Sequence, residues 1–194
     1  LTQSGRQHEL FLAQDPQQLP SLAERAAKKA RTVDGAVIGA GGDGTLNAGA
    51  RAAYAFDTPF GVLPMGTFNY FSRTHHIPED LAAALDAVLH GVPQPIQVGQ
   101  INGQLVLVNA SLGLYPDLLQ DRESWKRRYG RSRVVALAAA LATVLRGYRP
   151  LRLELGEGGT TSTVRTATLF VGNNPLQLAR LGLPVDDAIG DGRL

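Results

Sequence analysis

Apolar and polar residues alternate in blocks along the first half of the chain. Apolar residues recur at helical spacing from 19 to 30 and again from 81 to 89, which predicts two amphipathic helices. Short apolar runs bounded by turn residues predict strands at 8–13, 34–40 and 60–63. A further helix is predicted at 45–54. This order of strands and helices favours an α/β arrangement with a parallel sheet and crossover helices.

The pattern changes after residue 91. The segment 91–95 (GVPQP) is typical of a linker, and two strand-like runs then flank Asn102-Gly103, the dipeptide most typical of a tight β-hairpin. A helix is predicted over about 116–146. Further strands are predicted at 151–155 and 164–171. We therefore expect an α/β domain over 1–91 and a β-rich, mainly antiparallel domain over 92–194.

Composition and charge exclude several classes of function. The formal net charge is +2, so no strong positive field indicates a nucleic-acid partner, and the absence of cysteine excludes disulfides and thiolate metal sites. Residues 1–18 carry charges where a signal peptide would be apolar, and the longest apolar run, 134–145, is too short to span a bilayer. We expect a cytoplasmic protein.

A glycine cluster after the predicted strand at 34–40 is the first candidate site. The sequence GGDGT, from Gly41 to Thr45, stands between a strand and a helix, where backbone N–H groups and the helix dipole favour an anion. A carboxylate such as Asp43 repels phosphate unless a cation or proton lies between them. Asp43 therefore indicates a magnesium-bound nucleotide or acid–base chemistry on a phosphoryl acceptor. The alternative is a plain glycine turn with a capping aspartate.

A second glycine loop follows the next predicted strand. The segment Leu63–Arg73 (LPMGTFNYFSR) again places Gly-Thr before a helix-like stretch. Loops at the carboxyl ends of neighbouring parallel strands face one crevice, where open α/β sheets bind ligands. No lysine follows either set of glycines, so neither loop is a Walker A motif.

Together the two loops resemble the catalytic domain of the diacylglycerol kinases and their bacterial lipid-kinase relatives. NAD kinases and phosphofructokinases share the GGDGT-type signature, but the pattern Pro64-x-Gly-Thr-x-Asn69 is similar to the lipid kinases, and the glycine-rich segment of NAD kinases is absent. Three later segments are also similar to the second domain of this family: 108–119, 169–175 and 186–194.

The resemblance implies a fold and an activity. The fold is an N-terminal Rossmann-like parallel-sheet domain, as in NAD kinase and phosphofructokinase, followed by a mainly antiparallel β-sandwich that binds the lipid. The activity is ATP-dependent transfer of the γ-phosphoryl group to a lipid hydroxyl of diacylglycerol or a related alcohol. Two alternatives stay open, a soluble-metabolite kinase of the NAD-kinase type and a catalytically weak nucleotide-binding sensor.

The resemblance also assigns residues. Asp43 is expected to be catalytic, and Asp191 is expected to bind a second Mg²⁺ together with the carbonyls of Ala188 and Arg193, although a plain Asp-Gly turn is the alternative there. The expected ATP-binding residues are Gly41, Gly42, Asp43, Gly44, Thr45, Leu46, Asn47, Gly66, Thr67 and Asn69.

Three departures from the family pattern bear on activity. Tyr70 stands where the family often has aspartate. We expect the family's first strand, with its NP-x-SG turn, to be missing before residue 1. We also expect the C-terminal part, with the general base, to lie beyond residue 194. Tyr70 and the absent general base are the reason for the sensor alternative.

A basic cluster at 122–133 is the candidate surface for docking on anionic lipid headgroups. Six lysines and arginines are interleaved there with Trp125 and Tyr129, which suits contact with anionic headgroups, while a solvated helix face is the alternative. We expect a lipid substrate at the membrane surface and a peripheral location at the inner membrane. The acceptor lipid and the oligomeric state cannot be read from the sequence.

Overall fold

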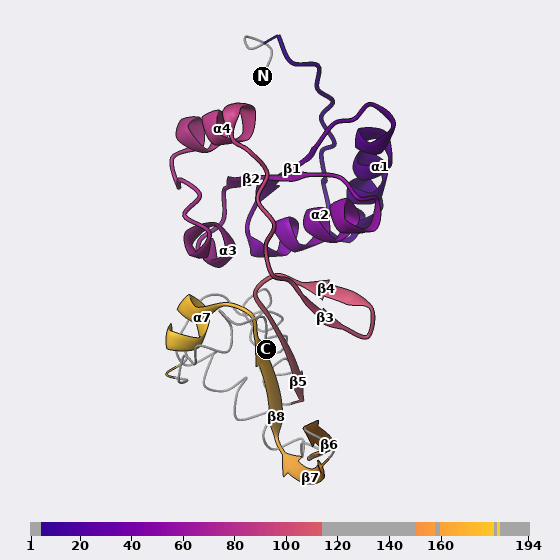
Figure 1. Cartoon of the computed structure of the whole chain (residues 1–194), viewed down its shortest axis with the longest axis vertical. Coiled ribbons are helices and arrows are strands. Elements are labelled where there is room, and N and C mark those ends of the chain that lie inside the picture. Colours follow the sequence, from indigo (N-terminus) through magenta and orange to yellow (C-terminus); the bar gives the residue numbers. More distant parts are fainter. Residues whose placement is uncertain (1–4, 114–149, 158–159, 181, 183–194) are drawn as a thin grey trace, which may run out of the picture. The chain divides into compact units, whose positions relative to one another are not determined.

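The computed structural model describes residues 5–113, 150–157, 160–180 and 182 (Figure 1). The chain divides into two compact units: one reaches Asn109 and resumes at Gly172, and the other runs from Ala110 to Val171. These limits differ from the boundary near residue 92, because both the segment 92–109 and the segment after 171 belong to the first unit. The assignment of two functional domains stays a prediction.

The first unit is built around a parallel strand pair. Strand β1 (Val37–Gly41) pairs with β2 (Phe60–Pro64) in a register that runs from Val37 opposite Phe60 to Gly41 opposite Pro64. Helix α2 (Asp43–Ala55) connects the two strands. This unit confirms the predicted strand–helix–strand order, with limits shifted by a few residues.

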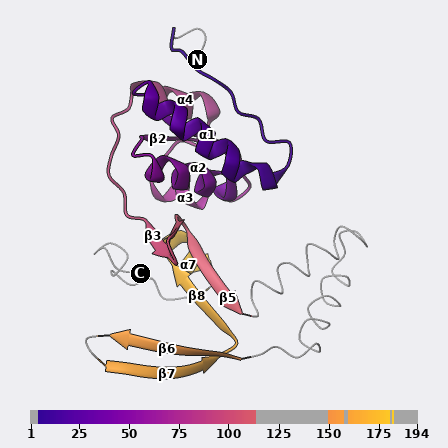
Figure 2. The ribbon, with the colours of Figure 1, turned by 90° about the vertical axis from the view of Figure 1, so that its right-hand side faces the viewer.

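Helix α1 (Leu19–Thr32) packs beside α2 on a core of small residues, and both views show the two helices adjacent (Figures 1 and 2). A short 3₁₀ turn, η2 (Pro16–Gln18), precedes α1, and the Asp15 side chain caps it. The core joins α1, β1 and α2 through the buried side chains of Ala27, Ala30, Val37, Ala52 and Ala53. Alanine at these positions lets the helices and strand approach closely.

The strand predicted at 8–13 was wrong. These residues have no regular structure, and Leu10 and Leu12 are 74% and 72% exposed. An apolar run forms a strand only where a neighbouring strand can complete its hydrogen bonds. In the described part of the chain, β1 pairs with β2 alone, and no strand pairs with residues 8–13.

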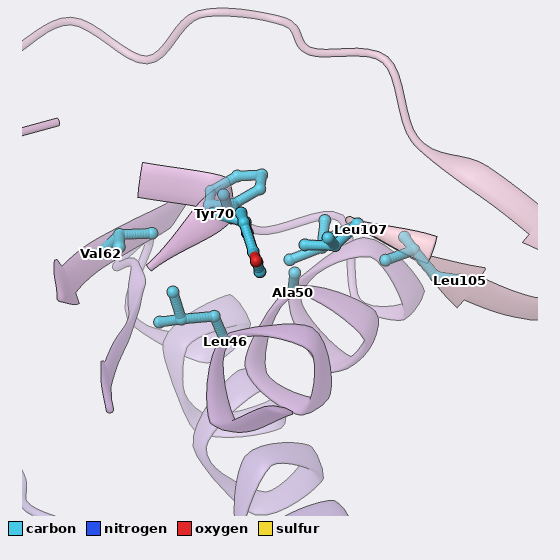
Figure 3. Close-up of a cluster of buried hydrophobic side chains, with 8 residues drawn as sticks. Leu46, Ala50, Val62, Tyr70, Leu105 and Leu107 are labelled. Atoms are coloured by element: carbon cyan, nitrogen blue, oxygen red, sulfur yellow. The ribbon is translucent and has the colours of Figure 1, made fainter. Parts of the chain in front are cut away.

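A second core lies where α2 meets the segments that follow β2 (Figure 3). Helix α3 (Tyr70–Thr74) comes directly after the second glycine loop, and α4 (Leu81–His90) follows it, capped by the Asp80 side chain on the Ala83 N–H and ending before Gly91 as predicted. The buried members of this core are Leu46, Ala50, Val62, Tyr70, Phe71, Leu105, Leu107 and Val108.

The predicted hairpin at Asn102-Gly103 is confirmed. Strands β3 (Gly99–Ile101) and β4 (Gln104–Val106) are antiparallel, and Asn102 and Gly103 both have positive φ, 50° and 74°, as a two-residue hairpin turn requires. The second arm is shorter than predicted, because the Leu107 N–H donates to a side chain of α2.

The second unit consists of strands in its described part. Strands β6 (Leu151–Glu157) and β7 (Thr160–Thr166) form an antiparallel pair, while β5 (Asn109–Gly113) pairs with β8 (Thr168–Gly172). The mixed α/β class is therefore confirmed, with parallel and antiparallel pairs. The Rossmann-like and sandwich arrangements stay predictions, and the helix predicted at 116–146 lies outside the described residues.

Candidate functional site

The structure brings the two predicted glycine loops into contact. Because Gly41 lies opposite Pro64 in the strand pair, both loops begin side by side, and the Met65 N–H donates to the Gly41 carbonyl at 2.9 Å. A Cβ atom on Gly66 would lie 2.5 Å from the Gly42 Cα, and one on Gly42 would lie 3.2 Å from the Gly66 Cα. The packing of one loop on the other therefore leaves no room for a Cβ atom on Gly66 and little room for one on Gly42.

Asp43 connects the loops through its carboxylate. Its Oδ2 accepts a hydrogen bond from the Tyr70 N–H at 3.2 Å, and its Oδ1 accepts one from the Phe71 N–H at 3.1 Å. The first residue of α2 therefore caps the N-terminus of α3. This positioning role was not predicted, since the capping alternative placed Asp43 on its own helix. A catalytic role for Asp43 stays a prediction.

Asn69 closes the second loop on itself. Its backbone is left-handed, with φ 47° and ψ 43°, and its Oδ1 accepts from the Gly66 N–H at 2.9 Å. Asparagine tolerates this conformation better than most residues. The turn leaves Thr67 and Phe68 exposed at its tip, while Asn69 and Tyr70 are buried beneath them.

The first turn of α2 has no side-chain cap and is open at Gly44. Its N-cap is Gly42, which provides no capping side chain, and a Cβ atom on Gly44 would meet nothing within 4 Å. At Gly41, by contrast, a Cβ atom would lie 2.7 Å from the Thr45 Oγ1, so the Thr45 side chain folds over that glycine. The first turn of α2 can therefore present backbone N–H groups to an anion at Gly44.

Two further predicted ATP-binding residues, Leu46 and Asn47, also have structural partners. Leu46 is fully buried in the second core, and its N–H donates to the Gly42 carbonyl at 3.0 Å. The Asn47 Oδ1 accepts from the Leu107 N–H at 3.0 Å. Contact with ATP stays a prediction for both residues, and the buried side chain of Leu46 does not support it.

Two asparagines of the segment 169–175 make long-range hydrogen bonds, and one of them, Asn174, anchors α3. The Asn174 side chain is 2% exposed, and its Nδ2 donates to the Tyr70 carbonyl at 3.2 Å and to the Thr74 Oγ1 at 2.8 Å. Its neighbour Asn173 donates through Nδ2 to the Leu107 carbonyl at 3.2 Å. Their partners are far away in the sequence, so no local pattern could indicate them.

The remaining predicted site residues cannot be placed. Asp191, Ala188 and Arg193, the expected second magnesium site, and the basic cluster at 122–133 lie outside the described residues. Within the described ranges, no group of three or more histidine, aspartate and glutamate side chains could bind a metal ion. No helix in those ranges is both long and apolar enough to cross a membrane.

Comparison with known proteins identifies the family. The sequence profile of the diacylglycerol kinase catalytic domain matches residues 1–101, slightly more than half of the chain. The chain belongs to the diacylglycerol kinase catalytic domain family. The resemblance read from GGDGT and Gly-Thr-x-Asn is thereby confirmed.

Individual members of the family show how much of the chain is shared. The diacylglycerol kinase of Bacillus subtilis (strain 168) is 42% identical over 104 residues, which cover 51% of this chain and 34% of that protein. The diacylglycerol kinase of Staphylococcus aureus (strain JH9) is 39% identical over 93 residues, which cover 47% and 28%. The matched region is thus about a third of each relative's length.

A solved structure has a similar fold. The crystal structure of a diacylglycerol kinase from Bacillus anthracis (strain Sterne) superposes with a TM-score of 0.58 at 22% identity, over 87% of this chain and 53% of that one. At this identity the likeness concerns the fold alone. It extends beyond the profile match into the later part of the chain.

Proposed function

We propose that this chain belongs to an ATP-dependent lipid kinase, which transfers the γ-phosphoryl group to a lipid hydroxyl of diacylglycerol or a related alcohol, and that residues 1–91 bind the nucleotide. In this reaction the bond between the γ-phosphorus and its bridging oxygen breaks, ADP leaves, a new P–O bond forms to the lipid oxygen, and the hydroxyl proton passes to a base or to solvent. The observation that carries the proposal is an uncapped, glycine-led helix N-terminus, in contact with the Gly66-Thr67 loop, in a member of this family.

The proposed phosphate site is the N-terminus of α2 rather than that of α3. The first N–H groups of α3, at Tyr70 and Phe71, already donate to the Asp43 carboxylate. The first turn of α2 has no side-chain cap and has open space at Gly44. Backbone N–H groups at the start of a helix, strengthened by the helix dipole, bind phosphate oxygens.

Asp43 has two parts in this proposal. By binding α3 it fixes the position of the loop that carries Thr67 relative to the start of α2. It also lies at the first residue of α2, one position before Gly44, where its negative charge disfavours a bare triphosphate. In a magnesium-bound nucleotide the charge of the ion offsets that repulsion. The carboxylate can take part because each of its oxygens can accept more than the one hydrogen bond seen here.

Magnesium fits this site as a partner of the nucleotide. When bound, the ion neutralises charge on the phosphates during transfer. Asp43 is the carboxylate of the two loops that could receive a magnesium-bound water. The chain's own residues then orient the nucleotide through the α2 N-terminus and the Gly66-Thr67 loop.

A phosphoryl-transfer assay on the intact protein tests the proposal. We expect transfer from ATP to diacylglycerol, a sphingoid base or undecaprenol presented in mixed micelles, and none to NAD. Transfer to NAD alone would favour the soluble-metabolite kinase. Nucleotide binding without transfer to any acceptor would favour the sensor, and absence of both would contradict the proposal.

A further inference from the structure

An arginine lies against the second glycine loop without a carboxylate partner among the described residues. The Arg180 Cζ lies 4.4 Å from the centre of the Phe68 ring, a cation–π contact. Arg180 is the last residue of α7 (Pro175–Arg180), and Phe68 is at the tip of the turn between Gly66 and Asn69. The two residues are far apart in the sequence and meet within the first unit.

Both residues of this contact are held in place by other residues of the first unit. Phe68 stacks on the ring of the buried Tyr70, with centroids 5.6 Å apart and an angle of 18° between the rings. Helix α7 is anchored to α3 by Asn174, whose Oδ1 caps the Gln177 N–H at 3.0 Å while its Nδ2 binds the Tyr70 carbonyl. Tyr70 thus supports both Phe68 and α7, and the guanidinium of Arg180 lies over the ring of Phe68, the residue that follows Thr67.

Three other cations of this unit have carboxylate partners. Salt bridges join Lys29 to Glu9, Arg31 to Asp57 and Arg73 to Glu79. Within the described ranges no carboxylate lies at salt-bridge distance from Arg180, and both Arg180 and Phe68 are exposed. A guanidinium stacked on a ring loses part of its hydration but keeps its N–H donors, which match a phosphate group in pairs.

We propose that Arg180 binds a phosphate group at the Gly66-Thr67 loop and that Phe68 positions its guanidinium for this contact. The inference rests on the proposed function, because the loop is taken as one wall of the phosphate site. The phosphate would come either from the nucleotide or from an anionic lipid, since both carry the same group. Arg180 is assigned a binding role, with no part in bond making.

Calorimetric titration of the intact protein tests the nucleotide source. Wild type, Arg180→Ala and Arg180→Lys are titrated with adenosine, AMP, ADP and a nonhydrolysable ATP analogue in the presence of Mg²⁺. We expect Arg180→Ala to weaken binding of the ATP analogue by about tenfold or more, as for loss of a charge-assisted hydrogen bond, and to leave adenosine binding unchanged. Arg180→Lys should lose part of that affinity, because lysine keeps the charge without the planar pair of donors.

Two further variants separate the contact from general effects on charge. Arg25 makes the same kind of cation–π contact with Phe11, 5.6 Å from its centre, but belongs to α1. Arg25→Ala should bind the nucleotides like wild type. Phe68→Leu keeps an apolar side chain but removes the ring, and we expect it to weaken phosphate binding by less than Arg180→Ala does.

Sedimentation with vesicles tests the lipid source. Phosphatidylcholine vesicles with and without phosphatidic acid are mixed with wild type, Arg180→Ala and Arg25→Ala at low salt. A selective loss for Arg180→Ala that depends on phosphatidic acid would assign the phosphate to the lipid, and a loss confined to the nucleotides would assign it to ATP. If Arg180→Ala matches wild type in both experiments, the inference is overturned. If wild type binds no nucleotide, the proposed function fails. The inference about Arg180 then depends only on the comparison of Arg180→Ala with wild type in the vesicle experiment.

Discussion

The Asp43 carboxylate accepts a hydrogen bond from the backbone N–H of Tyr70, which lies 27 residues further along the chain. A second bond, from Phe71, completes a cap on α3 that its own N-cap residue does not supply, because the Asn69 side chain is bonded to Gly66. The two glycine loops are thereby fixed to each other by side-chain hydrogen bonds as well as by the contact of Gly42 with Gly66. The aspartate of GGDGT therefore has a positioning role that does not depend on any ligand.

Replacing Asp43 by asparagine should lower both stability and activity. Asparagine keeps one acceptor oxygen but turns an NH₂ group toward a backbone N–H, so we expect a loss of about 1–2 kcal/mol in the free energy of unfolding. Phosphoryl transfer should be abolished, since the charge is lost as well. Denaturant unfolding and the transfer assay on the same variant measure the two effects.

Asp80→Asn is the matched control for this variant. The Asp80 Oδ1 caps α4 through the Ala83 N–H at 2.9 Å, away from the glycine loops. It should lose a similar amount of stability and keep full nucleotide binding and transfer. An unfolding free energy of Asp43→Asn equal to that of wild type would disprove the capping role.

Gly66→Ala and Gly44→Ala should separate packing from ligand contact. The new Cβ atom would lie 2.5 Å from the Gly42 Cα at Gly66 but would meet nothing within 4 Å at Gly44. We therefore expect Gly66→Ala to lower stability by about 1–3 kcal/mol, the usual effect of overpacking, and Gly44→Ala to fold like wild type. Gly44→Ala should instead weaken binding of the ATP analogue, because a methyl group would stand in the space assigned to the phosphates. Thermal unfolding measures the stability of each variant, and calorimetric titration measures its affinity for the ATP analogue. Equal stability of Gly66→Ala and Gly44→Ala would refute the explanation that a Cβ atom on Gly66 disrupts the contact between the loops.

Asn47→Ala tests a residue that was predicted to bind ATP and is seen bonded to the protein. Its Oδ1 accepts from the Leu107 N–H, and Leu107 is 3% exposed, so removing the acceptor leaves a donor without its partner. We expect a loss of about 1–3 kcal/mol in the free energy of unfolding without nucleotide. A variant as stable as wild type but defective in nucleotide binding would assign Asn47 to the ligand alone.

The end of α3 should make stability depend on pH. The His75 ring packs against Phe71 with centroids 4.6 Å apart, and desolvation, with a smaller effect of His76, lowers the pKa of His75 below its usual value of 6.5. The unfolded chain then takes up a proton more readily than the folded chain, so stability should fall as the pH decreases below 6.5. His75→Gln should make this decrease less steep, whereas His8→Gln, in the exposed N-terminal coil, should not. Equal slopes for wild type and His75→Gln in unfolding experiments would reject this pKa shift.

Local signals predicted the parts of the fold that depend on neighbours in sequence. The pattern around GGDGT predicted β1, α2 and β2, and Asn102-Gly103 predicted the hairpin, because strand alternation, helical spacing and turn chemistry act over a few residues. The apolar run at 8–13 has the same local pattern but no neighbouring strand in the described part, and that prediction was wrong.

The positions of the site residues were predicted better than their partners. Both glycine loops lie together as expected, since parallel strands end at the same edge. The bond of Asn174 to Tyr70, across 104 residues, and that of Asp43 to Tyr70 depend on how the chain returns on itself. No spacing in the sequence encodes such contacts, and for the same reason the partner of Arg180 was not foreseen.

The most direct test of the account follows the backbone amides of the loops by nuclear magnetic resonance during a nucleotide titration. Isotope-labelled intact protein is titrated with Mg²⁺ and a nonhydrolysable ATP analogue, and separately with adenosine. We predict large shifts of the Gly44, Thr45 and Thr67 amide signals with the triphosphate but not with adenosine, and smaller shifts at Tyr70 and Phe71, whose N–H groups donate to Asp43. Saturation with the triphosphate that leaves the Gly44 and Thr45 amides unchanged would contradict the proposed phosphate site.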